Sequence, residues 1–122
     1  MYIGVDIIEL ERVSKLLNSG NQMLNIFTKN ELDFANNFGA KRKIETLAGK
    51  FAAKEATAKA LGTGFNGLIK PNEIEILNMD NGMPYLVLHN GSFEYANKLD
   101  IHEYHISISH NMTTAIAFVI LA

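Results

Sequence analysis

The stretch KRKIETLAGKFAAKEATAKAL, residues 41–61, reads as one long helix that Gly62 closes as a C-terminal cap. At about 100° per residue, helical winding gathers the apolar side chains of this stretch on one stripe. The stripe consists of Ile44, Leu47, Ala48, Phe51 and Ala58. We expect it to pack on a sheet formed by the flanking segments, so this helix decides the fold.

Glu55 falls near the centre of the apolar stripe, with Lys54 and Lys59 at its two edges. A carboxylate that faces a core costs several kcal/mol of folding free energy unless a partner compensates it. The partner can be a metal ion, a salt bridge or a bound proton. A metal ion would make Glu55 part of a functional site.

Length and composition indicate a single globular domain over residues 1–122, because 48% of the residues are hydrophobic and 20% are charged. The net charge of −2 argues against a broad basic surface for nucleic acid. The basic residues nevertheless gather on the central helix, which favours a discrete anionic ligand. They are Lys41, Arg42, Lys43, Lys50, Lys54 and Lys59.

The sequence contains no cysteine, which excludes disulfides, zinc thiolates and a cysteine nucleophile. The first residues, MYIGVDIIELERV, lack the basic start and the cleavage site of a signal peptide. No apolar run approaches the ~20 residues of a membrane span. We therefore expect a cytoplasmic protein.

The flanking segments predict an α+β fold, mainly an antiparallel sheet packed on the long central helix. Strands are expected at 2–10, 74–79, 84–89, 105–109 and 113–122, and helices at 11–18, 28–38, 41–61 and 92–99. Thr28 and Glu31 form a capping box, Ser92 is the expected cap of the last helix, and Asp80-Asn81-Gly82 is a hairpin turn. Because residues 113–122 are almost wholly apolar, we expect that strand to be covered on both faces, partly by another subunit.

Asp6 is a second carboxylate in an apolar setting, since it lies in the first predicted strand. Where that strand meets the central helix, Asp6 and Glu55 can hold a hard cation such as Mg²⁺. This ion takes one or two carboxylates and completes its shell with water and phosphates. In the alternative, Asp6 is a strand-end residue and Lys59 neutralises Glu55 as its i+4 neighbour. Periodicity alone leaves both alternatives open.

Two further segments carry groups that suit an anionic ligand. The backbone amides of Gly62-Thr63-Gly64 can cradle a pyrophosphate near Lys59, although glycine after a helix is also an ordinary cap. His105, in HISISH at 105–110, can bind a phosphate or an adenine ring or transfer a proton. In the alternative it lies on the solvated face of a strand. The serines of this segment lack a Ser-His-Asp context, so we infer no nucleophile.

Taken in order, these segments resemble the holo-[acyl-carrier-protein] synthases, the short bacterial class of 4′-phosphopantetheinyl transferases. The matching pieces are GVDIIE at 4–9 with Arg12, FT at 27–28 with Glu31, LAGKFAAKEATAKALGTG at 47–64, NGMP at 81–84 and HISISH at 105–110. Each motif alone is ambiguous, but the ordered set is specific and spans nearly the whole chain.

The resemblance implies transfer of the phosphopantetheine arm of coenzyme A to a serine of apo-acyl carrier protein, in support of fatty acid biosynthesis. It implies that Asp6 and Glu55 hold Mg²⁺ and that Lys59 steadies the phosphates and the leaving group. It assigns Lys59, Gly62, Thr63, Gly64, His105, Arg42, Asn81, Gly82 and Pro84 to coenzyme A, and Arg12 and Lys15 to the carrier protein. It also implies a homotrimer with active sites at the subunit interfaces.

The same resemblance gives the nucleophile to the carrier protein, whose serine passes its proton to Glu55 or to a metal-associated water. Two departures concern binding: residues 18–26 (NSGNQMLNI) hold no basic residue where relatives carry arginines, and Met83 stands where a basic residue is common. Two other classes compete with the enzyme. One is a module that binds coenzyme A or a nucleotide without turnover, and the other is a structural protein in which Glu55 pairs with Lys59.

Overall fold

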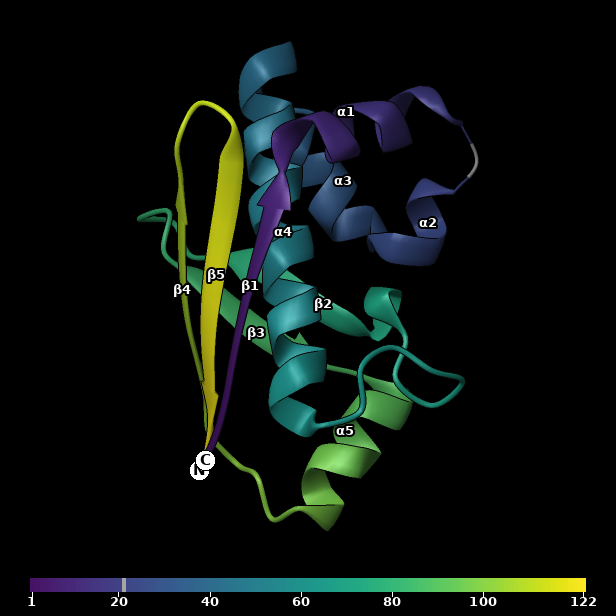
Figure 1. Cartoon of the computed structure of the whole chain (residues 1–122), viewed down its shortest axis with the longest axis vertical. Helices are drawn as coiled ribbons and strands as arrows, with labels where there is room; N and C mark the ends of the chain where they lie inside the picture. Colours follow the sequence, from purple (N-terminus) through teal and green to yellow (C-terminus); the bar gives the residue numbers. More distant parts are fainter. Residues whose placement is uncertain (21) are drawn as a thin grey trace.

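The longest element of the computed structural model is α4 (Ala40–Leu61), which lies against a three-stranded sheet (Figure 1). The model describes residues 1–20 and 22–122. The other elements are β1 (Tyr2–Glu9), α1 (Leu10–Asn18), α2 (Met23–Ile26), α3 (Lys29–Ala35), the 3-10 helix η1 (Pro71–Glu73), β2 (Ile74–Asn78), β3 (Pro84–Leu88), α5 (Asn90–Lys98), β4 (Tyr104–His110) and β5 (Thr114–Leu121). The predicted strands, the hairpin and the long helix are present, whereas α2 and η1 were not predicted.

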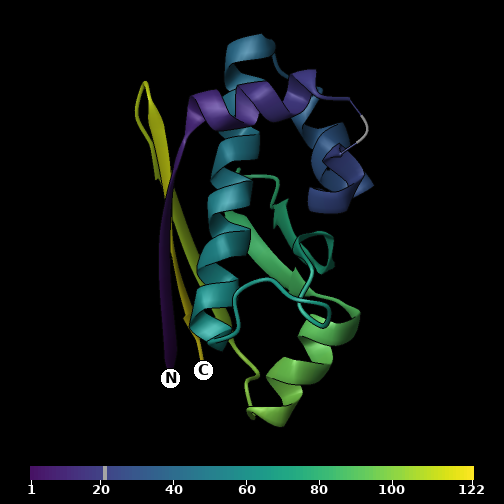
Figure 2. The same cartoon turned by 45° about the vertical axis from the view of Figure 1, so that its right-hand side comes forward.

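Helix α4 lies between two layers (Figure 2). On one side is the antiparallel sheet β1-β5-β4, in which Tyr2 pairs with Leu121 and Tyr104 also pairs with Leu121. On the other side lie the hairpin β2-β3 and the short helices. The arrangement encloses one hydrophobic core that draws on both ends of the chain.

Strand β1 approaches α4 closely at Gly4. A Cβ atom at this position would lie 1.9 Å from the carbonyl oxygen of Ala56, so only glycine fits here. Asp6 follows on the same, inward side of β1, and Glu55 precedes Ala56 on the helix. The close approach therefore brings the strand carboxylate to the helix carboxylate.

The outer face of the sheet is apolar and exposed. Ile3, Val5 and Ile7 of β1 and Ile116 and Phe118 of β5 point away from α4, with exposed fractions from 41% to 63%. The prediction that residues 113–122 are covered on both faces is therefore wrong for the single chain, because α4 covers the sheet on one side only. Cover by another subunit stays a prediction.

Two local capping predictions have different outcomes. The capping box is confirmed, since the Thr28 amide donates to Glu31 at 2.8 Å and the Glu31 amide donates to the Thr28 hydroxyl at 3.2 Å. Ser92, however, does not cap α5, which begins at Asn90. Its hydroxyl donates to the carbonyls of Glu73 and His89 and so ties the helix to η1.

A buried ion pair fixes α4 to the hairpin layer. Lys54 and Glu31 meet at 2.8 Å and are both fully buried. Lys54 also donates to the carbonyls of Pro71 and Ile74, while Glu31 accepts from the amide of Ile76. Lys54 was predicted at the edge of the apolar stripe, but its ammonium lies in the core, where Glu31 and two carbonyls of distant segments meet it.

Among the helices in the described part of the chain, none has the length and apolarity to cross a membrane.

Candidate active site

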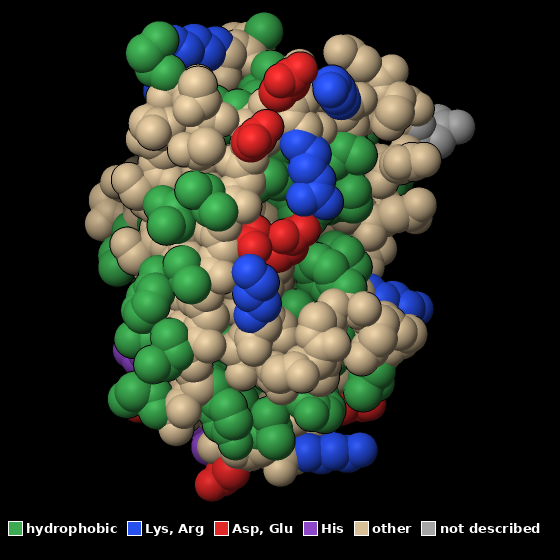
Figure 3. Space-filling model, in the orientation of Figure 1, with side chains coloured by type: hydrophobic (Ala, Val, Ile, Leu, Met, Phe, Trp, Pro, Cys, Tyr) green, Lys and Arg blue, Asp and Glu red, His purple; other side chains and the backbone are tan. Residues whose placement is uncertain are grey.

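The inner side of β1 and the second half of α4 bring two carboxylates and two cations together. Asp6 is 8% exposed, and its Oδ1 atom lies 2.8 Å from the Nζ atom of Lys59. Glu55 lies 3.7 Å from a guanidinium nitrogen of Arg12. On the face that Figure 3 shows, acidic side chains lie between basic ones over the line where β1 meets α4.

The pairing differs from the i+4 salt bridge considered from the sequence. Lys59 donates to Asp6 and, at 3.2 Å, to the carbonyl of Val5. Glu55 therefore lacks the close i+4 ion pair with Lys59 that the purely structural alternative requires. Its contact with Arg12 is long for a salt bridge. The structure brings Asp6, Glu55, Lys59 and Arg12 into one cluster.

The pKa of Glu55 is raised to about 7. Burial is the largest cause, because it disfavours the charged carboxylate, and the hydrogen bond and negative charge of Asp6 add to it. Arg12 and Lys59 act in the opposite direction. The pKa of Lys59 is raised by its hydrogen bond to Asp6. Glu55 therefore exchanges its proton near neutral pH.

The Asp6–Glu55 pair fits a hard cation. When Glu55 is ionised, the buried Oδ2 atom of Asp6 finds no hydrogen-bond donor in the described part of the chain, since Glu55 can donate to Asp6 only in its protonated form. A buried carboxylate oxygen without a donor is costly unless an external ligand such as a cation meets it. Residues 1–20 and 22–122 offer no group of three or more metal-ligating side chains. A cation at the pair would therefore need water or phosphate oxygens as further ligands, and Mg²⁺ is usually coordinated in this way.

The loop after α4 serves as a helix cap. Gly62 has φ 81°, and its amide donates to the carbonyl of Lys59 at 3.0 Å. The amides of Thr63 and Gly64 both donate to the carbonyl of Ala58 at 3.2 Å. Because the helix end uses these three amides, the predicted amide cradle for pyrophosphate is not formed in this conformation, and the cap alternative is the one observed.

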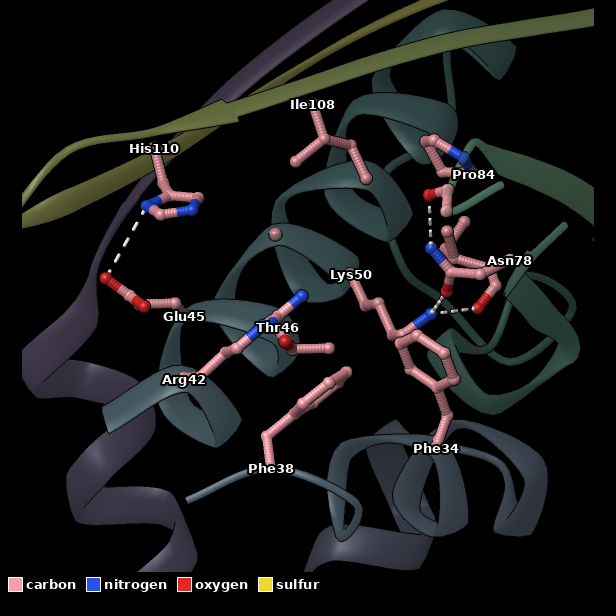
Figure 4. A pocket seen from close by; sticks show the side chains of 13 residues that line it. Phe34, Phe38, Arg42, Glu45, Thr46, Lys50, Asn78, Pro84, Ile108 and His110 are labelled. Atoms are coloured by element: carbon pink, nitrogen blue, oxygen red, sulfur yellow. Dashed lines mark hydrogen bonds and ion pairs between the residues drawn. The ribbon is translucent and has the colours of Figure 1, made fainter. Parts of the chain in front are cut away.

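A pocket of about 490 Å³ lies beside the first half of α4 (Figure 4). The guanidinium of Arg42 lies 4.1 Å from the centre of the Phe38 ring on one side of the pocket. Lys50 donates to the carbonyl of Ile76 and to Asn78, both at 2.6 Å, and burial lowers its pKa to about 8. Aromatic rings beside cations suit a nucleotide, whose base stacks and whose phosphates need positive charge.

Three of the residues predicted for coenzyme A line this pocket, namely Arg42, Gly82 and Pro84. Asn81 shapes the turn beside them, since its side chain accepts from the amide of Met83 at 3.0 Å. His105 does not line the pocket as the described residues define it. It lies exposed on β4, 3.4 Å from Glu103, on the outer side of the sheet with Ser107 and Ser109, and its assignment to coenzyme A stays a prediction.

His110 is the histidine that lines the pocket, and it lies 3.6 Å from Glu45. His110 was not predicted as a site residue, although the alternation of strand residues already separates it from His105. Successive residues of a strand alternate between faces, so His110 shares the inward side of β4 with Ile108, and His105 points the other way.

The pocket and the carboxylate cluster are separated within one chain. Arg42 and Glu55 lie about 20 Å apart along α4 and point to different sides of the helix. The coenzyme A residues implied by the resemblance therefore fall into two places that one copy of the chain does not join.

A groove of about 300 Å³ beside α1 adjoins the carboxylate cluster. Both residues predicted for the carrier protein, Arg12 and Lys15, line it together with Leu16, Ser19, Gln22, Ile26 and Phe51. The segment 18–26, noted for its lack of basic residues, supplies part of this lining, and Asn21 lies outside the described residues.

The chain is similar to known proteins over nearly its whole length. The model of the 4′-phosphopantetheinyl transferase superfamily matches residues 2–116. The chain therefore belongs to this superfamily and is a phosphopantetheinyl transferase. The resemblance inferred from the ordered motifs is confirmed.

Individual relatives are similar over nearly their whole length. The holo-[acyl-carrier-protein] synthase of Clostridium perfringens is 45% identical, with 98% of this chain and 91% of the relative covered. The crystal structure of the Bacillus anthracis synthase in complex with CoA (3′,5′-ADP) is 39% identical, has a TM-score of 0.82, and covers 98% of this chain and 94% of its own. The crystal structure of the Neisseria meningitidis synthase is 32% identical, has a TM-score of 0.87, and covers 99% of this chain and 97% of its own. These similarities confirm the predicted α+β fold.

Proposed function

We propose that the chain transfers 4′-phosphopantetheine from coenzyme A to a serine of apo-acyl carrier protein and releases adenosine 3′,5′-bisphosphate. The observation that carries the proposal is the pair of buried Asp6 and half-buried Glu55, which has an unpartnered Asp6 oxygen beside Lys59 in a chain of this superfamily. A cytoplasmic location and a role in fatty acid biosynthesis remain predictions.

Asp6 and Glu55 would hold Mg²⁺. Bound there, the ion would neutralise negative charge on the pyrophosphate of coenzyme A. Lys59 is 57% exposed while its ammonium lies at Asp6, so it can turn to a phosphate oxygen without crossing the core. We assign it to the phosphates and to the charge that develops on the leaving group.

Glu55 is also the group of this cluster that suits proton transfer. The serine hydroxyl of the carrier protein has to lose a proton when its oxygen attacks phosphorus. In the metal-free chain the pKa of Glu55 is raised to about 7; a bound cation would lower it and leave Glu55 ionised, which is the form that can accept a proton. A metal-associated water would be the alternative acceptor.

The pocket beside Arg42 is the candidate site for the nucleotide end of coenzyme A. Phe34 and Phe38 offer rings for the adenine, while Arg42, Lys50 and His110 offer positive charge or donors for phosphate. Since this pocket and the Asp6–Glu55 pair lie apart in one chain, we infer that two copies build each active site together.

The exposed outer face of the sheet supports such an assembly. The strand registers align Val5 with Phe118 and Ser107, and Ile7 with Ile116 and Ser109, so the face is a continuous apolar surface with one polar edge. A second copy of the chain is the occupant that also completes the active site, and we propose the homotrimer. Light scattering should then give three times the chain mass of 13.5 kDa, whereas a monomer would reject the assembly.

The function is tested by mass spectrometry of the acceptor. An apo-acyl carrier protein is incubated with the chain, coenzyme A and Mg²⁺, and the carrier is then weighed. The proposal expects a gain of one phosphopantetheinyl group that requires all components. Binding of coenzyme A without any mass gain on several carrier proteins would favour the binding module instead.

A further inference from the structure

Arg12 stands between the groove beside α1 and the Asp6–Glu55 pair. Its guanidinium lies 3.7 Å from Glu55 and 5.1 Å from the centre of the Phe51 ring, and Phe51 lines the groove. Phe51 and Glu55 are one helical turn apart on α4. A single side chain therefore touches both the groove and the catalytic cluster.

The groove has the chemistry of a docking site for a partner with acidic groups around an apolar side chain. Its wall is apolar at Leu16, Ile26 and Phe51. Its charged members are Arg12 and Lys15, both exposed. Positive charge at the edge of an apolar depression attracts and orients an acidic partner.

While the groove is empty, the positive charge of Arg12 acts on Glu55. It opposes a divalent cation at the Asp6–Glu55 pair, because a cation would be placed close to a guanidinium. Arg12 is 58% exposed, so its head can turn from Glu55 toward the groove at little steric cost. A carboxylate of a docked partner would compete directly with Glu55 for this guanidinium.

We propose that Arg12 is a positioning residue that couples acceptor docking to cation binding at Asp6 and Glu55. With the groove empty, Arg12 pairs with Glu55 and weakens cation binding. With an acceptor carboxylate in the groove, Arg12 pairs with that carboxylate and leaves Glu55 to the cation. The inference rests on the proposed function in that the groove takes the acceptor and the carboxylates take the metal.

The coupling has to be reciprocal. If the acceptor strengthens cation binding, then the cation strengthens acceptor binding by the same factor. The enzyme would therefore load its metal most tightly when the acceptor is in place.

The test measures Mn²⁺ binding to the full chain without coenzyme A, using the EPR signal of the free ion. Mn²⁺ serves as the probe because it prefers the same oxygen ligands as Mg²⁺. Arg12→Gln should lower the dissociation constant of Mn²⁺ about fivefold, the effect of removing one half-exposed charge near the site. Arg12→Lys, which keeps the charge, should stay near the wild type.

Lys15→Gln is the matched control. Lys15 lines the same groove on the same helix, but its ion pair is with Glu11 at 3.5 Å. This variant should leave the Mn²⁺ dissociation constant within about twofold of the wild type, because its charge lies outside the carboxylate cluster.

A second set of titrations adds saturating apo-acyl carrier protein whose acceptor serine is replaced by alanine. It should tighten Mn²⁺ binding severalfold in the wild type and leave Arg12→Gln unchanged, and the variant also corrects for Mn²⁺ bound by the carrier itself. Equal Mn²⁺ affinity of Arg12→Gln and wild type, or an acceptor effect that persists in Arg12→Gln, would overturn the coupling alone. Failure of the wild type to bind Mn²⁺ would reject the metal pair too, whereas transfer itself is judged separately by the mass of the acceptor.

Discussion

The two halves of α4 present different chemistry. The first half carries Arg42 and Lys50 beside aromatic rings and borders an open pocket. The second half is rich in alanine, and β1 comes so close at Gly4 that a Cβ atom would clash with Ala56. The first half thus leaves room for a ligand, whereas at the second half the close packing of β1 brings the carboxylate of Asp6 near that of Glu55.

This difference teaches how a small chain can hold the parts of a two-substrate site. A single helix fixes both parts rigidly, because buried Lys54 anchors it between them. It also keeps them too far apart to act within one copy. We therefore propose that the first half of α4 binds the nucleotide, that the second half carries the chemistry, and that assembly of two copies brings them together.

The largest effect is expected where β1 meets the second half of α4. Asp6→Ala and Glu55→Ala should each lower kcat by at least about a thousandfold, because each removes a ligand of the proposed cation. Circular dichroism should show the fold retained. Asp33→Ala, which removes an exposed carboxylate of α3, is the control and should keep full activity. Near-normal turnover of either site variant would rule out the metal assignment.

The first half of α4 should respond in a different kinetic constant. Arg42→Ala should raise the KM for coenzyme A by about 10- to 100-fold with a smaller change in kcat, since it removes a charge that binds substrate and does not touch the reacting atoms. Lys59→Ala should instead lower mainly kcat. Steady-state kinetics against coenzyme A give both values. If the two variants shared one kinetic pattern, the division of labour along the helix would be incorrect.

The smallest effect concerns pH and stability of the metal-free chain. The pKa of Glu55 is raised in the fold to about 7, so the folded chain keeps a proton that the unfolded chain releases near 4.5. This contribution is complete below about pH 4.5 and is lost as pH rises through 7, on the order of 1–2 kcal/mol or several degrees in Tm.

Thermal unfolding with a chelator between pH 5 and 8 measures this slope. Glu55→Gln is the comparison, because it cannot release a proton and keeps the other titrating groups, including the histidines. The wild type should lose more stability toward pH 8 than this variant does. An identical decline in the two proteins would show that Glu55 is already ionised at low pH.

Local patterns were enough for the features that depend on neighbouring residues. The extent of α4, the Thr28–Glu31 capping box and the burial of the Asp6 carboxylate in the first strand all follow from short stretches of sequence. Their chemistry could be predicted because a misplaced carboxylate is costly wherever the rest of the fold lies.

Features that depend on distant segments could not be predicted in this way. The burial of Lys54 requires Glu31 and two carbonyls near β2, and the exposure of Phe118 depends on which side of the sheet α4 covers. The choice between His105 and His110 likewise needed the inward side of β4. Alternation separates the two histidines, but only the packing says which side holds the pocket.

Mixing two impaired variants tests the central claim, that two copies share each active site. Asp6→Ala lacks one carboxylate of the Asp6–Glu55 pair and should be inactive, whereas Arg42→Ala lacks the guanidinium of the pocket and should keep at most about a tenth of wild-type activity at coenzyme A concentrations far below the raised KM. Unfolded and refolded together in equal amounts, they should recover about a quarter of wild-type activity, because random assembly joins an intact half from each copy at that frequency. A mixture no more active than its components would contradict the account.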